Sequence, residues 1–467
     1  MDIKRDLMPF SQGTYQALRK IVGPGHITDQ ETELKCYAYD ATVFQAMPEA
    51  VAFPGTAEEI SAILRLANEH RFPVVPRGAG SGMSGGSVPI QGGLVLVMSR
   101  FNRIRRIDTR NFLAVVEPGV VNRDLQSAVE AKGLFYPPDP ASLSFSTLGG
   151  NVAECAGGAR AVKYGVTRDY VLGLNVVLPT GEILKTGTQT AKGVVGFDLT
   201  RLLVGSEGTL GIFTEFTVKL LPKPETRQPV LVFFDRLDLA TQAVVEILQA
   251  GIIPSSLEFM DQPSLQAVEQ FLHLGLPREA EAALLIEVDG DRDLVNRQSR
   301  RVVQACEQLG AVGIRTASSP QEAEDLWKAR RSISPALFRI RPNKINEDIV
   351  VPRAQIPEAI RRFQDIALRR DLPIVSFGHA GDGNIHVNVM YDQKQAGQEA
   401  QAHQAVEEIF KAVLELGGSL SGEHGIGLAK ASYLSWELDS VSLMVMKKIK
   451  DLFDPNRILN PGKIFPA

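Results

Sequence analysis

The order of apolar and polar positions predicts a β-α-β unit near the start of the chain. Residues 50–53 form a short apolar run typical of a strand, and residues 74–76 form another. Between them, T-x-x-E at residues 56–59 is a capping box, and apolar residues recur along 60–67 at the spacing of one helical face. Residues 1–47, ahead of this unit, are predicted to be a mostly helical lead-in.

Small residues interrupt the periodic pattern in the rest of the first half. Residues 136–158 are so rich in small residues and proline that they are predicted to be a long irregular segment, which in a compact domain usually has a function. Residues 221–225, L-P-K-P-E, have the composition of a linker. The periodic elements predicted here are strands at 94–97, 113–117 and 212–220, a helix at 122–133 and a hairpin at 171–185.

Beyond the linker, predicted strands and helices alternate. A helix at 323–334 is expected to end or kink near Pro335. Its Arg330 and Arg331 are either solvated surface charge or, near a metal, a fork for a substrate carboxylate. Lys344 is predicted to lie on a turn. The other elements predicted here are strands at 230–234, 256–259, 283–288 and 349–351, and helices at 239–248 and 293–309.

Composition narrows the class of protein. The 467 residues, enough for about three ordinary domains or two large ones, include 50 basic and 54 acidic residues, and the net charge of −4 argues against a nucleic-acid partner. Cys36, Cys155 and Cys306 form no C-x-x-C pair and no iron–sulfur spacing, which fits a reducing compartment. No signal peptide and no bilayer-spanning apolar run is recognisable. We therefore expect a soluble, cytoplasmic protein, with peripheral contact to a membrane left open.

A glycine- and serine-rich loop at residues 77–87 is a candidate phosphate site. Residues 80–85 fit G-x-G-x-x-G, but that dinucleotide fingerprint must open a helix, whereas Val88-Pro89 and a strand follow here. Backbone N–H groups of such a loop can form an anion nest without a helix, so pyrophosphate binding is predicted, with a flexible surface turn as the alternative. A further small-residue loop occupies residues 205–211.

Three of the seven histidines lie in two short segments, S-F-G-H-A-G-D-G-N-I-H at 376–386 and G-G-S-L-S-G-E-H-G-I-G-L-A-K at 417–430. The two histidines of the first segment and Glu423 of the second would offer two imidazoles and a carboxylate to a metal ion with an open position. His424 would be a further imidazole suited to act as a general base. The alternative is that these are loop histidines hydrogen-bonded to the backbone. The spacing matches neither H-E-x-x-H nor a zinc finger, so it names neither the metal nor the reaction.

With these motifs placed, the chain resembles the FAD-linked oxidases of the vanillyl-alcohol oxidase superfamily. The branch that it resembles is the D-2-hydroxyacid dehydrogenases, which include D-lactate dehydrogenase, D-2-hydroxyglutarate dehydrogenase and the flavin subunit of glycolate oxidase. The resemblance covers the chain from about residue 50 to residue 463. The matching motifs, besides the two histidine segments, are P-R-G-A-G-S-G-M-S-G-G at 76–86, L-G-G-N-V-A-E-C-A-G-G at 148–158, Y-G-V-T-R-D-Y at 164–170, V-G-S-E-G-T-L-G at 204–211 and D-P-N-R-I-L-N-P-G-K at 454–463.

The resemblance implies an α+β fold with two parts. A FAD-binding domain of two α+β subdomains would span residues 48–223. A substrate and metal domain, an antiparallel sheet covered by helices, would span residues 224–430. Residues 431–467 would return to the FAD-binding domain, and 1–47 would remain a lead-in.

The same resemblance implies where FAD would bind. The pyrophosphate would lie on residues 77–82, and Asn460 would approach the isoalloxazine ring. Some members bind flavin covalently through a histidine in the first glycine loop, and this loop has none, so non-covalent FAD is expected. The implied FAD-binding residues are Pro76, Arg77, Gly78, Ala79, Gly80, Ser81, Gly82, Pro138, Thr147, Gly149, Gly150, Ala153, Gly157, Gly158, Gly205, Glu207, Gly208, Gly211, Ile212 and Asn460.

For the metal, the resemblance implies a divalent ion, zinc, manganese or iron, held by His379, His386 and Glu423. His424 would act as the catalytic base. Arg330, on the helix after L-W, would be the clamp for the substrate carboxylate and therefore also counts as catalytic. The other implied substrate-binding residues are Ser334, Lys344 and Asn388.

The implied reaction is FAD-dependent oxidation of a small D-2-hydroxyacid, D-lactate or glycolate, to the 2-oxoacid, with hydride transfer to flavin N5. A second cation such as Lys344 would instead suit D-2-hydroxyglutarate. Because the chain has no iron–sulfur cysteines, electrons would leave to a partner protein or a quinone-type acceptor, and both a homodimer and a complex with an iron–sulfur subunit are compatible. Two other classes stay open: a metal hydrolase, and a flavin subunit that is active only within a larger glycolate oxidase complex.

Overall fold

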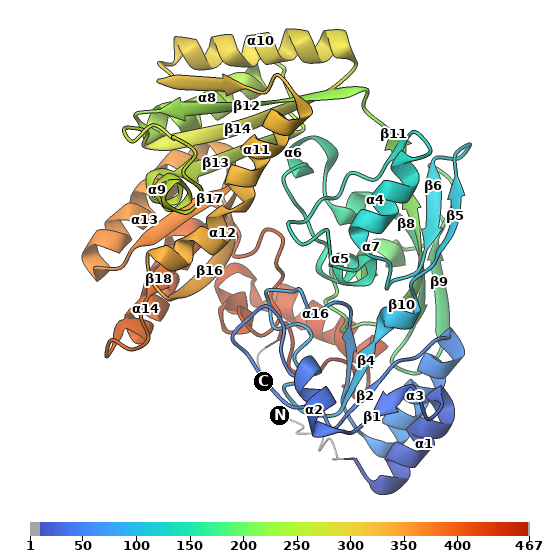
Figure 1. Ribbon diagram of the computed structural model, residues 1–467. Helices are drawn as coiled ribbons and strands as arrows, with labels where there is room; N and C mark the ends of the chain where they lie inside the picture. Colours follow the sequence, from blue (N-terminus) through green and yellow to red (C-terminus); the bar gives the residue numbers. More distant parts are fainter. Residues whose placement is uncertain (1–9, 466–467) are drawn as a thin grey trace. The chain divides into compact units, whose positions relative to one another are not determined.

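The computed structural model describes residues 10–465, so the start of the predicted lead-in, residues 1–9, lies outside the described residues. The chain forms two units, whose elements are labelled in Figure 1. The first unit comprises Met1–Ala156, Val166–Lys223 and Glu423–Ala467, and the second comprises Gly157–Gly165 and Pro224–Gly422. Each unit combines sheets with helices, which confirms the predicted α+β fold.

A four-stranded sheet in the first unit contains the predicted β-α-β unit. Its order is β1-β2-β4-β3, with β2, β4 and β3 parallel and β1 antiparallel to β2. Thr56 caps α3 (Ala57–His70) by accepting a hydrogen bond from the backbone N–H of Glu59, as predicted from the capping box. The lead-in is only partly helical, because it also supplies β1. The strands are β1 (Ile27–Thr28), β2 (Ala50–Ala52), β3 (Val74–Arg77) and β4 (Leu94–Val97), and the lead-in helices are α1 (Gln12–Val22) and α2 (Glu31–Leu34).

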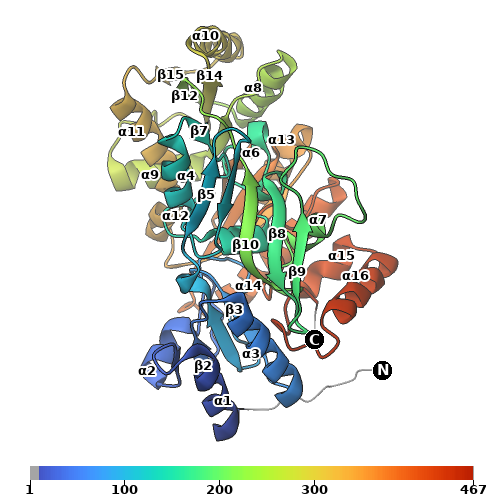
Figure 2. The same cartoon turned by 90° about the vertical axis from the view of Figure 1, so that its right-hand side faces the viewer.

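The second sheet of this unit has five antiparallel strands in the order β5-β6-β10-β8-β9, visible in Figure 2. The predicted hairpin forms between β8 and β9, and the first glycine loop follows β3 and precedes β4, as the sequence predicted. The strands are β5 (Ile104–Asp108), β6 (Leu113–Val116), β8 (Val171–Val177), β9 (Ile183–Gly187) and β10 (Ile212–Lys219); β7 (Leu134–Phe135) pairs with β11 (Leu221–Pro222), and the helices are α4 (Asn122–Glu130), α5 (Leu148–Glu154) and α7 (Leu199–Leu203).

The prediction that residues 136–158 are irregular throughout is wrong, because α5 forms within them. Thr147 caps this helix by accepting a hydrogen bond from the backbone N–H of Gly150. The backbone N–H of Gly149 also donates to Pro118 O at 2.8 Å. Capping and tertiary contact thus override the poor helix propensity of two adjacent glycines.

The C-terminal segment completes the core of the first unit. After α15 (Leu434–Glu437) and α16 (Ser440–Phe453), the chain runs beside β3: the N–H of Val74 donates to Ile458 O at 2.8 Å, and the N–H of Asn460 donates to Val74 O at 2.7 Å. Ile458 and Leu459 are fully buried in the same cluster as Val74. Residues far apart in the sequence therefore share one core.

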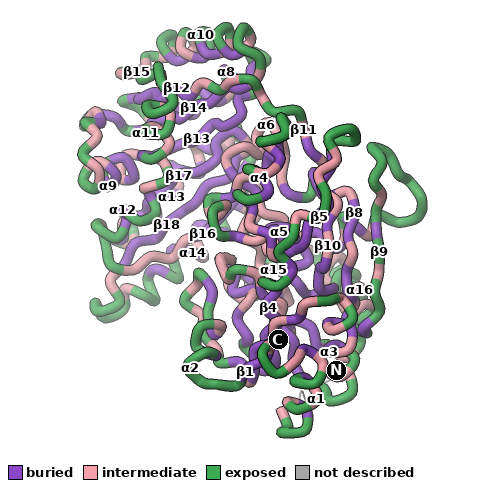
Figure 3. Tube along the Cα trace, turned by 45° about the vertical axis from the view of Figure 1, so that its right-hand side comes forward, coloured by how far each residue is buried: buried purple, intermediate pink, exposed green. Residues whose placement is uncertain are grey.

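The second unit is built on a seven-stranded antiparallel sheet in the order β15-β12-β14-β13-β17-β18-β16. Figure 3 shows its central strands as buried and the outer side of α10 as exposed. The strands are β12 (Thr226–Phe234), β13 (Ser256–Asp261), β14 (Ala282–Gly290), β15 (Gly313–Thr316), β16 (Asn343–Val350), β17 (Ile374–His379) and β18 (Asn384–Tyr391). The helices are α6 (Ala161–Tyr164), α8 (Leu237–Gln249), α9 (Gln262–Leu272), α10 (Arg292–Gln308), α11 (Pro320–Arg331), α12 (Ile333–Ala336), α13 (Ile356–Arg370) and α14 (Gln398–Glu415).

Helices cover both faces of this sheet, with α9, α11 and α12 on one face and α8, α13 and α14 on the other (Figures 1 and 2). Phe377 of β17 and Met390 of β18 belong to the apolar cluster beneath α9, α11 and α12. Side chains alternate between faces along a strand, so His379 and His386 point to this same face. Asp348 lies directly opposite His386 in the β16–β18 register and shares the face.

Two local predictions in this unit are wrong. Lys344 does not lie on a turn, because residues 343–350 pair with β18 along their whole length. The helix predicted to continue to Ser334 ends at Arg331, and Pro335 lies inside the short α12. Within residues 10–465, no helix has both the length and the apolar character needed to cross a bilayer.

Candidate active site

A cavity lies in the first unit. Its walls are the loop after β3, residues 140–156, the segment 207–213, and Glu423 with His424. The segments predicted to hold FAD thus enclose one space.

Close backbone approach explains the glycines in these walls. A Cβ on Gly208, whose φ is +65°, would lie 2.8 Å from Pro76 Cγ. A Cβ on Gly149 would lie 2.7 Å from Pro118 Cβ, and one on Gly78 would overlap Thr147 Oγ1. Only glycine permits these approaches.

Arg77 packs next to the first glycine loop and forms hydrogen bonds there. Its side chain is buried, donates from Nη1 to Tyr39 O at 2.7 Å and to Ser87 Oγ at 3.3 Å, and lies over the ring of Tyr37. Burial lowers the pKa of Arg77, yet the guanidinium stays cationic at neutral pH. A fixed positive charge next to the loop favours an anionic ligand.

Two carboxyl groups, the buried Glu207 and the half-buried Glu154, lie at the cavity wall. Glu207 accepts hydrogen bonds from the backbone N–H groups of Ile426 at 2.8 Å and Gly427 at 2.6 Å. Burial raises the pKa of Glu207, and burial together with the charge of Glu207 raises that of Glu154. Through these two hydrogen bonds Glu207 holds residues 426–427, and with them the neighbouring His424, at the cavity wall.

Most residues predicted to bind FAD line this cavity, and five do not: Pro138, Gly157, Gly158, Gly205 and Asn460. Asn460 does not line the cavity but holds two segments of its wall together, since its Nδ2 donates to Gly86 O and Glu207 O at 2.9 Å each. The predicted residues that line the cavity are Pro76, Arg77, Gly78, Ala79, Gly80, Ser81, Gly82, Thr147, Gly149, Gly150, Ala153, Glu207, Gly208, Gly211 and Ile212. Lining residues that the sequence interpretation missed include Met98, Pro118, Pro140, Glu154 and Phe213.

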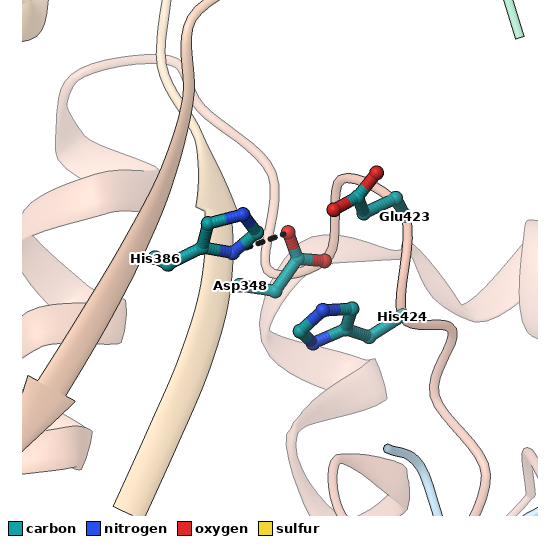
Figure 4. Close-up of side chains that lie close together, drawn as sticks. All are labelled: Asp348, His386, Glu423 and His424. Carbon is teal, nitrogen blue, oxygen red and sulfur yellow. Dashed lines mark ion pairs between the residues drawn. The ribbon is translucent and has the colours of Figure 1, made fainter. Parts of the chain in front are cut away.

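The second unit gathers polar side chains on the sheet face under α9, α11 and α12. The rings of His379 and His386 lie edge to face with centroids 5.2 Å apart. The imidazole of His386 points toward the Asp348 carboxylate, with Nδ1 and Oδ1 3.8 Å apart (Figure 4). Asn388 is fully buried, and among the described residues its Oδ1 has no hydrogen-bond partner. These side chains offer nitrogen and oxygen donors of the kind that zinc, manganese and iron accept.

Asp348, which the sequence interpretation missed, is fully buried and holds the chain ahead of Glu423. Its carboxylate accepts hydrogen bonds from Asn384 Nδ2 at 2.6 Å and from the backbone N–H of Gly422 at 2.8 Å. Glu423 is the next residue in the chain, and Figure 4 draws it with His424. An acidic residue directly ahead of the apolar run I-V-V was the available signal, since a buried charge needs a partner.

The two arginines of α11 differ. Arg331 pairs with Glu324 on the surface, whereas Arg330 is nearly buried, pairs through Nη2 with Glu258 Oε2 at 2.7 Å, and lies over the ring of Phe377. The interpretation of Arg331 as solvated charge therefore fits, and Arg330 belongs to the polar group on the sheet. The sequence interpretation missed Glu258.

Ser334 and Lys344 lie together in the same unit. Lys344 Nζ donates to Ser334 Oγ at 2.6 Å and lies 5.2 Å from the ring centre of Phe338. Burial lowers the pKa of Lys344 to about 8. The ammonium is thus mostly charged at neutral pH, and it is available to pair with an anion.

Family comparison identifies both parts of the chain. Residues 223–464 match the family described as FAD linked oxidases, C-terminal domain, and residues 48–187 match the FAD binding domain family. The chain is 48% identical to the glycolate oxidase subunit GlcD of Bacillus subtilis, over 96% of either chain. It is 39% identical to GlcD of Escherichia coli strain K12, covering 97% of this chain and 90% of that one. It is 38% identical to a D-lactate dehydrogenase of Anaerostipes hadrus, over 90% of either chain.

Solved structures agree on the fold. p-Cresol methylhydroxylase superposes with a TM-score of 0.82 at 19% identity, covering 98% of both chains. The 4-ethylphenol oxidase of Gulosibacter chungangensis superposes with a TM-score of 0.79 at 21% identity, again over 98% of both chains. At these identities the likeness establishes the fold alone.

Proposed function

The chain belongs to the FAD-linked oxidases, and on that premise we propose that it oxidises a small D-2-hydroxyacid, D-lactate or glycolate, to the 2-oxoacid. The observation that carries the proposal is His424 in the wall of the cavity formed by the FAD-binding segments. Relatives named for glycolate and D-lactate support this substrate class. FAD, when bound, supplies the hydride acceptor, flavin N5.

We further propose that FAD is bound non-covalently by the first unit, with residues 48–223 as its FAD-binding domain and residues 431–467 completing it. The substrate and the metal would be bound by residues 224–430. The glycine approaches around the cavity support the FAD site, because a Cβ there would collide with neighbouring segments of the wall and change the shape of the cavity. The first glycine loop contains no histidine, which supports non-covalent binding.

A divalent metal, zinc, manganese or iron, fits the donor groups at His379, His386 and Glu423. The edge-to-face imidazoles and the anchoring of Gly422 by Asp348, directly ahead of Glu423, support this proposal. When bound, such a metal lowers the pKa of a substrate hydroxyl that it contacts. Asp348 itself is an additional candidate ligand or a support for Glu423.

His424 is the proposed base that accepts the hydroxyl proton of the substrate. Arg330 would hold the substrate carboxylate and so decide which face of Cα meets the flavin, because a guanidinium binds a carboxylate through two parallel hydrogen bonds. Asn388 and Ser334 would contribute polar contacts. Lys344, a second cation, supports D-2-hydroxyglutarate as an alternative substrate with a second carboxylate.

The reduced flavin must pass its electrons on. We propose a partner protein or a quinone-type acceptor, because the chain has no cysteine spacing for an iron–sulfur cluster and its relatives include proteins named as subunits. An iron–sulfur subunit would carry the electrons onward from the flavin. We also propose that the protein is cytoplasmic and lies at the membrane periphery, where it could reach either a partner protein or a quinone-type acceptor.

The test is an anaerobic visible spectrum of the purified protein before and after D-lactate, glycolate and D-2-hydroxyglutarate in turn. Bleaching of the flavin band by one of them would establish the reaction. A flavin band that none of them bleaches would contradict this substrate class, and a folded, unstripped protein without a flavin band would contradict the cofactor as well.

His424→Ala is expected to retain FAD and to slow flavin reduction by two to four orders of magnitude, the usual contribution of a general base. His70→Ala, an exposed histidine of α3 in the same unit, is the control and should reduce at the wild-type rate. Stopped-flow bleaching at the wild-type rate in His424→Ala would exclude His424 as the base.

A further inference from the structure

Glu258 is a buried carboxylate in the middle of the sheet of the second unit. It lies in β13, a strand whose every residue is buried, and is itself 1% exposed. Moving an isolated carboxylate out of water is strongly unfavourable, so a charge retained here needs partners on both oxygens.

Each oxygen of Glu258 has a different partner. Oε1 lies 2.7 Å from His379 Nδ1, and Oε2 lies 2.7 Å from Arg330 Nη2. Both partners are nearly buried, with 10% and 11% of their side chains exposed. Glu258 therefore bridges the two side chains.

The contact with Oε1 engages Nδ1 of His379. An imidazole that donates from Nδ1 to a carboxylate keeps its lone pair on Nε2, which is the form that binds a metal. The carboxylate also fixes the orientation of the ring and makes the imidazole a stronger ligand.

The contact with Oε2 orients Arg330. The guanidinium is held between the carboxylate and the face of Phe377, 4.8 Å from its ring centre. Its Nε is buried, and no described residue accepts a hydrogen bond from it. The guanidinium thus has donor capacity left after binding Glu258, which a substrate carboxylate could use.

We propose that Glu258 is a positioning residue that fixes the tautomer of His379 and the direction of Arg330 together, so that one carboxylate supports both metal binding and substrate recognition. This inference rests on the proposed function. Glu258 is not a catalytic residue, because it acts only through the two side chains that it holds.

Glu258→Gln tests this directly. The amide is uncharged and forms no ion pair with Arg330, and only one of its two polar atoms can accept a hydrogen bond. If its NH₂ faces Nδ1 of His379, the proton of the imidazole moves to Nε2, and the metal-binding lone pair is lost. Glu287→Gln is the matched control, because Glu287 is a buried glutamate of the adjacent strand β14 that binds Trp327 Nε1 at 2.9 Å instead.

The experiment uses the FAD-loaded, full-length chain. Each variant is depleted with a chelator, dialysed against buffered series of Zn²⁺ and Mn²⁺, and analysed for bound metal by mass spectrometry and for FAD by absorbance. In Glu258→Gln the metal concentration at half-occupancy should rise about 10- to 100-fold with FAD content unchanged. In Glu287→Gln both should match the wild type.

Kinetics at a saturating metal concentration test whether Glu258 also orients Arg330. With the site refilled, Glu258→Gln should still show a raised KM for D-lactate and glycolate, because Arg330 has lost its anchor. Glu258→Asp, which keeps the charge but shortens the reach, should also weaken metal binding or raise KM, and it replaces the Gln variant if that does not fold. In ¹⁵N-histidine spectra of the metal-free protein, the Nδ1–H form of His379 should be lost in Glu258→Gln.

Wild-type metal half-occupancy and KM in a folded Glu258→Gln protein would overturn the inference and leave the proposed function intact. A wild-type protein that holds FAD and is bleached by a hydroxyacid but binds neither metal would overturn both the inference and the proposed metal site. An equal loss in Glu287→Gln would overturn the inference, since it would reveal a general weakening of the sheet.

Discussion

The packing of Gly149 against Pro118 predicts how much a single methyl group perturbs the FAD unit. A Cβ on residue 149 would lie 2.7 Å from Pro118 Cβ and 3.0 Å from Pro118 O, whereas ordinary contacts begin near 3.4 Å. Neither atom is at the end of a flexible side chain, so the backbone has to move. The hydrogen bond from Gly149 N–H to Pro118 O would move with it.

Overpacking of this kind costs about 1–3 kcal/mol, and the better helix propensity of alanine returns about 0.5–1 kcal/mol. Gly149→Ala should therefore lower the free energy of unfolding by about 1–2 kcal/mol and the melting temperature by roughly 2–8 °C. Because residues 149 and 118 both line the cavity, the dissociation constant of FAD should rise about tenfold, which corresponds to about 1.4 kcal/mol.

The neighbouring glycine provides the control. A Cβ on Gly150 would meet only Thr147 Oγ1 at 3.6 Å, so Gly150→Ala should stabilise the FAD-free protein by about 0.4–1 kcal/mol. Thermal melts of the FAD-free proteins and fluorescence titration of FAD measure both effects. Equal melting temperatures for the two variants would refute the packing argument.

Two further predictions concern charged groups of the second unit. Lys344→Met should raise the steady-state KM for D-2-hydroxyglutarate at least about tenfold and leave the KM for glycolate within about twofold. Only the dicarboxylate has a second anionic group to pair with Lys344, whose pKa is about 8. Equal changes in the two KM values would place Lys344 outside the substrate site. Burial raises the pKa of Asp261 from 3.8 to about 7, so between these pH values the folded state keeps a proton that the unfolded state has lost. The free energy of unfolding should therefore fall by about 1.4 kcal/mol per pH unit as the pH rises from about 4 to about 7, and then level off. Urea unfolding of Asp261→Asn across this range should lack that slope, and an identical pH profile in both proteins would contradict the assignment.

The alternation of residues predicted much of the second unit, including the strands at 256–259 and 283–288. Glu258 could not be predicted, because its partner His379 lies 121 residues away and only the pairing of β13 with β17 makes them neighbours. Lys344 was misplaced for a related reason. The run N-K-I-N-E-D has few apolar residues and resembles a turn, although Asn346 and Asp348 lie opposite the polar Asn388 and His386 of β18.

In the first unit the small-residue loops predicted the walls of the cavity, and local rules failed within them. Helix α5 contains two glycines, and its stability comes from the Thr147 cap and from contact with Pro118, which is 31 residues earlier in the chain. A glycine-rich run has the same composition whether it is a loop or a closely packed helix. Tertiary contact decides between the two.

The position of residues 458–460 beside β3 has a consequence for folding during synthesis. Strand β3 stands at the edge of its sheet, and the segment that covers this edge is made only after the whole second unit. At roughly 5–20 residues per second, the nascent chain carries a bare strand edge for tens of seconds, which invites misassembly with other chains. Chaperones that shield the chain during translation should therefore raise the yield of folded protein, and messages cut short before Asn460 should yield insoluble products.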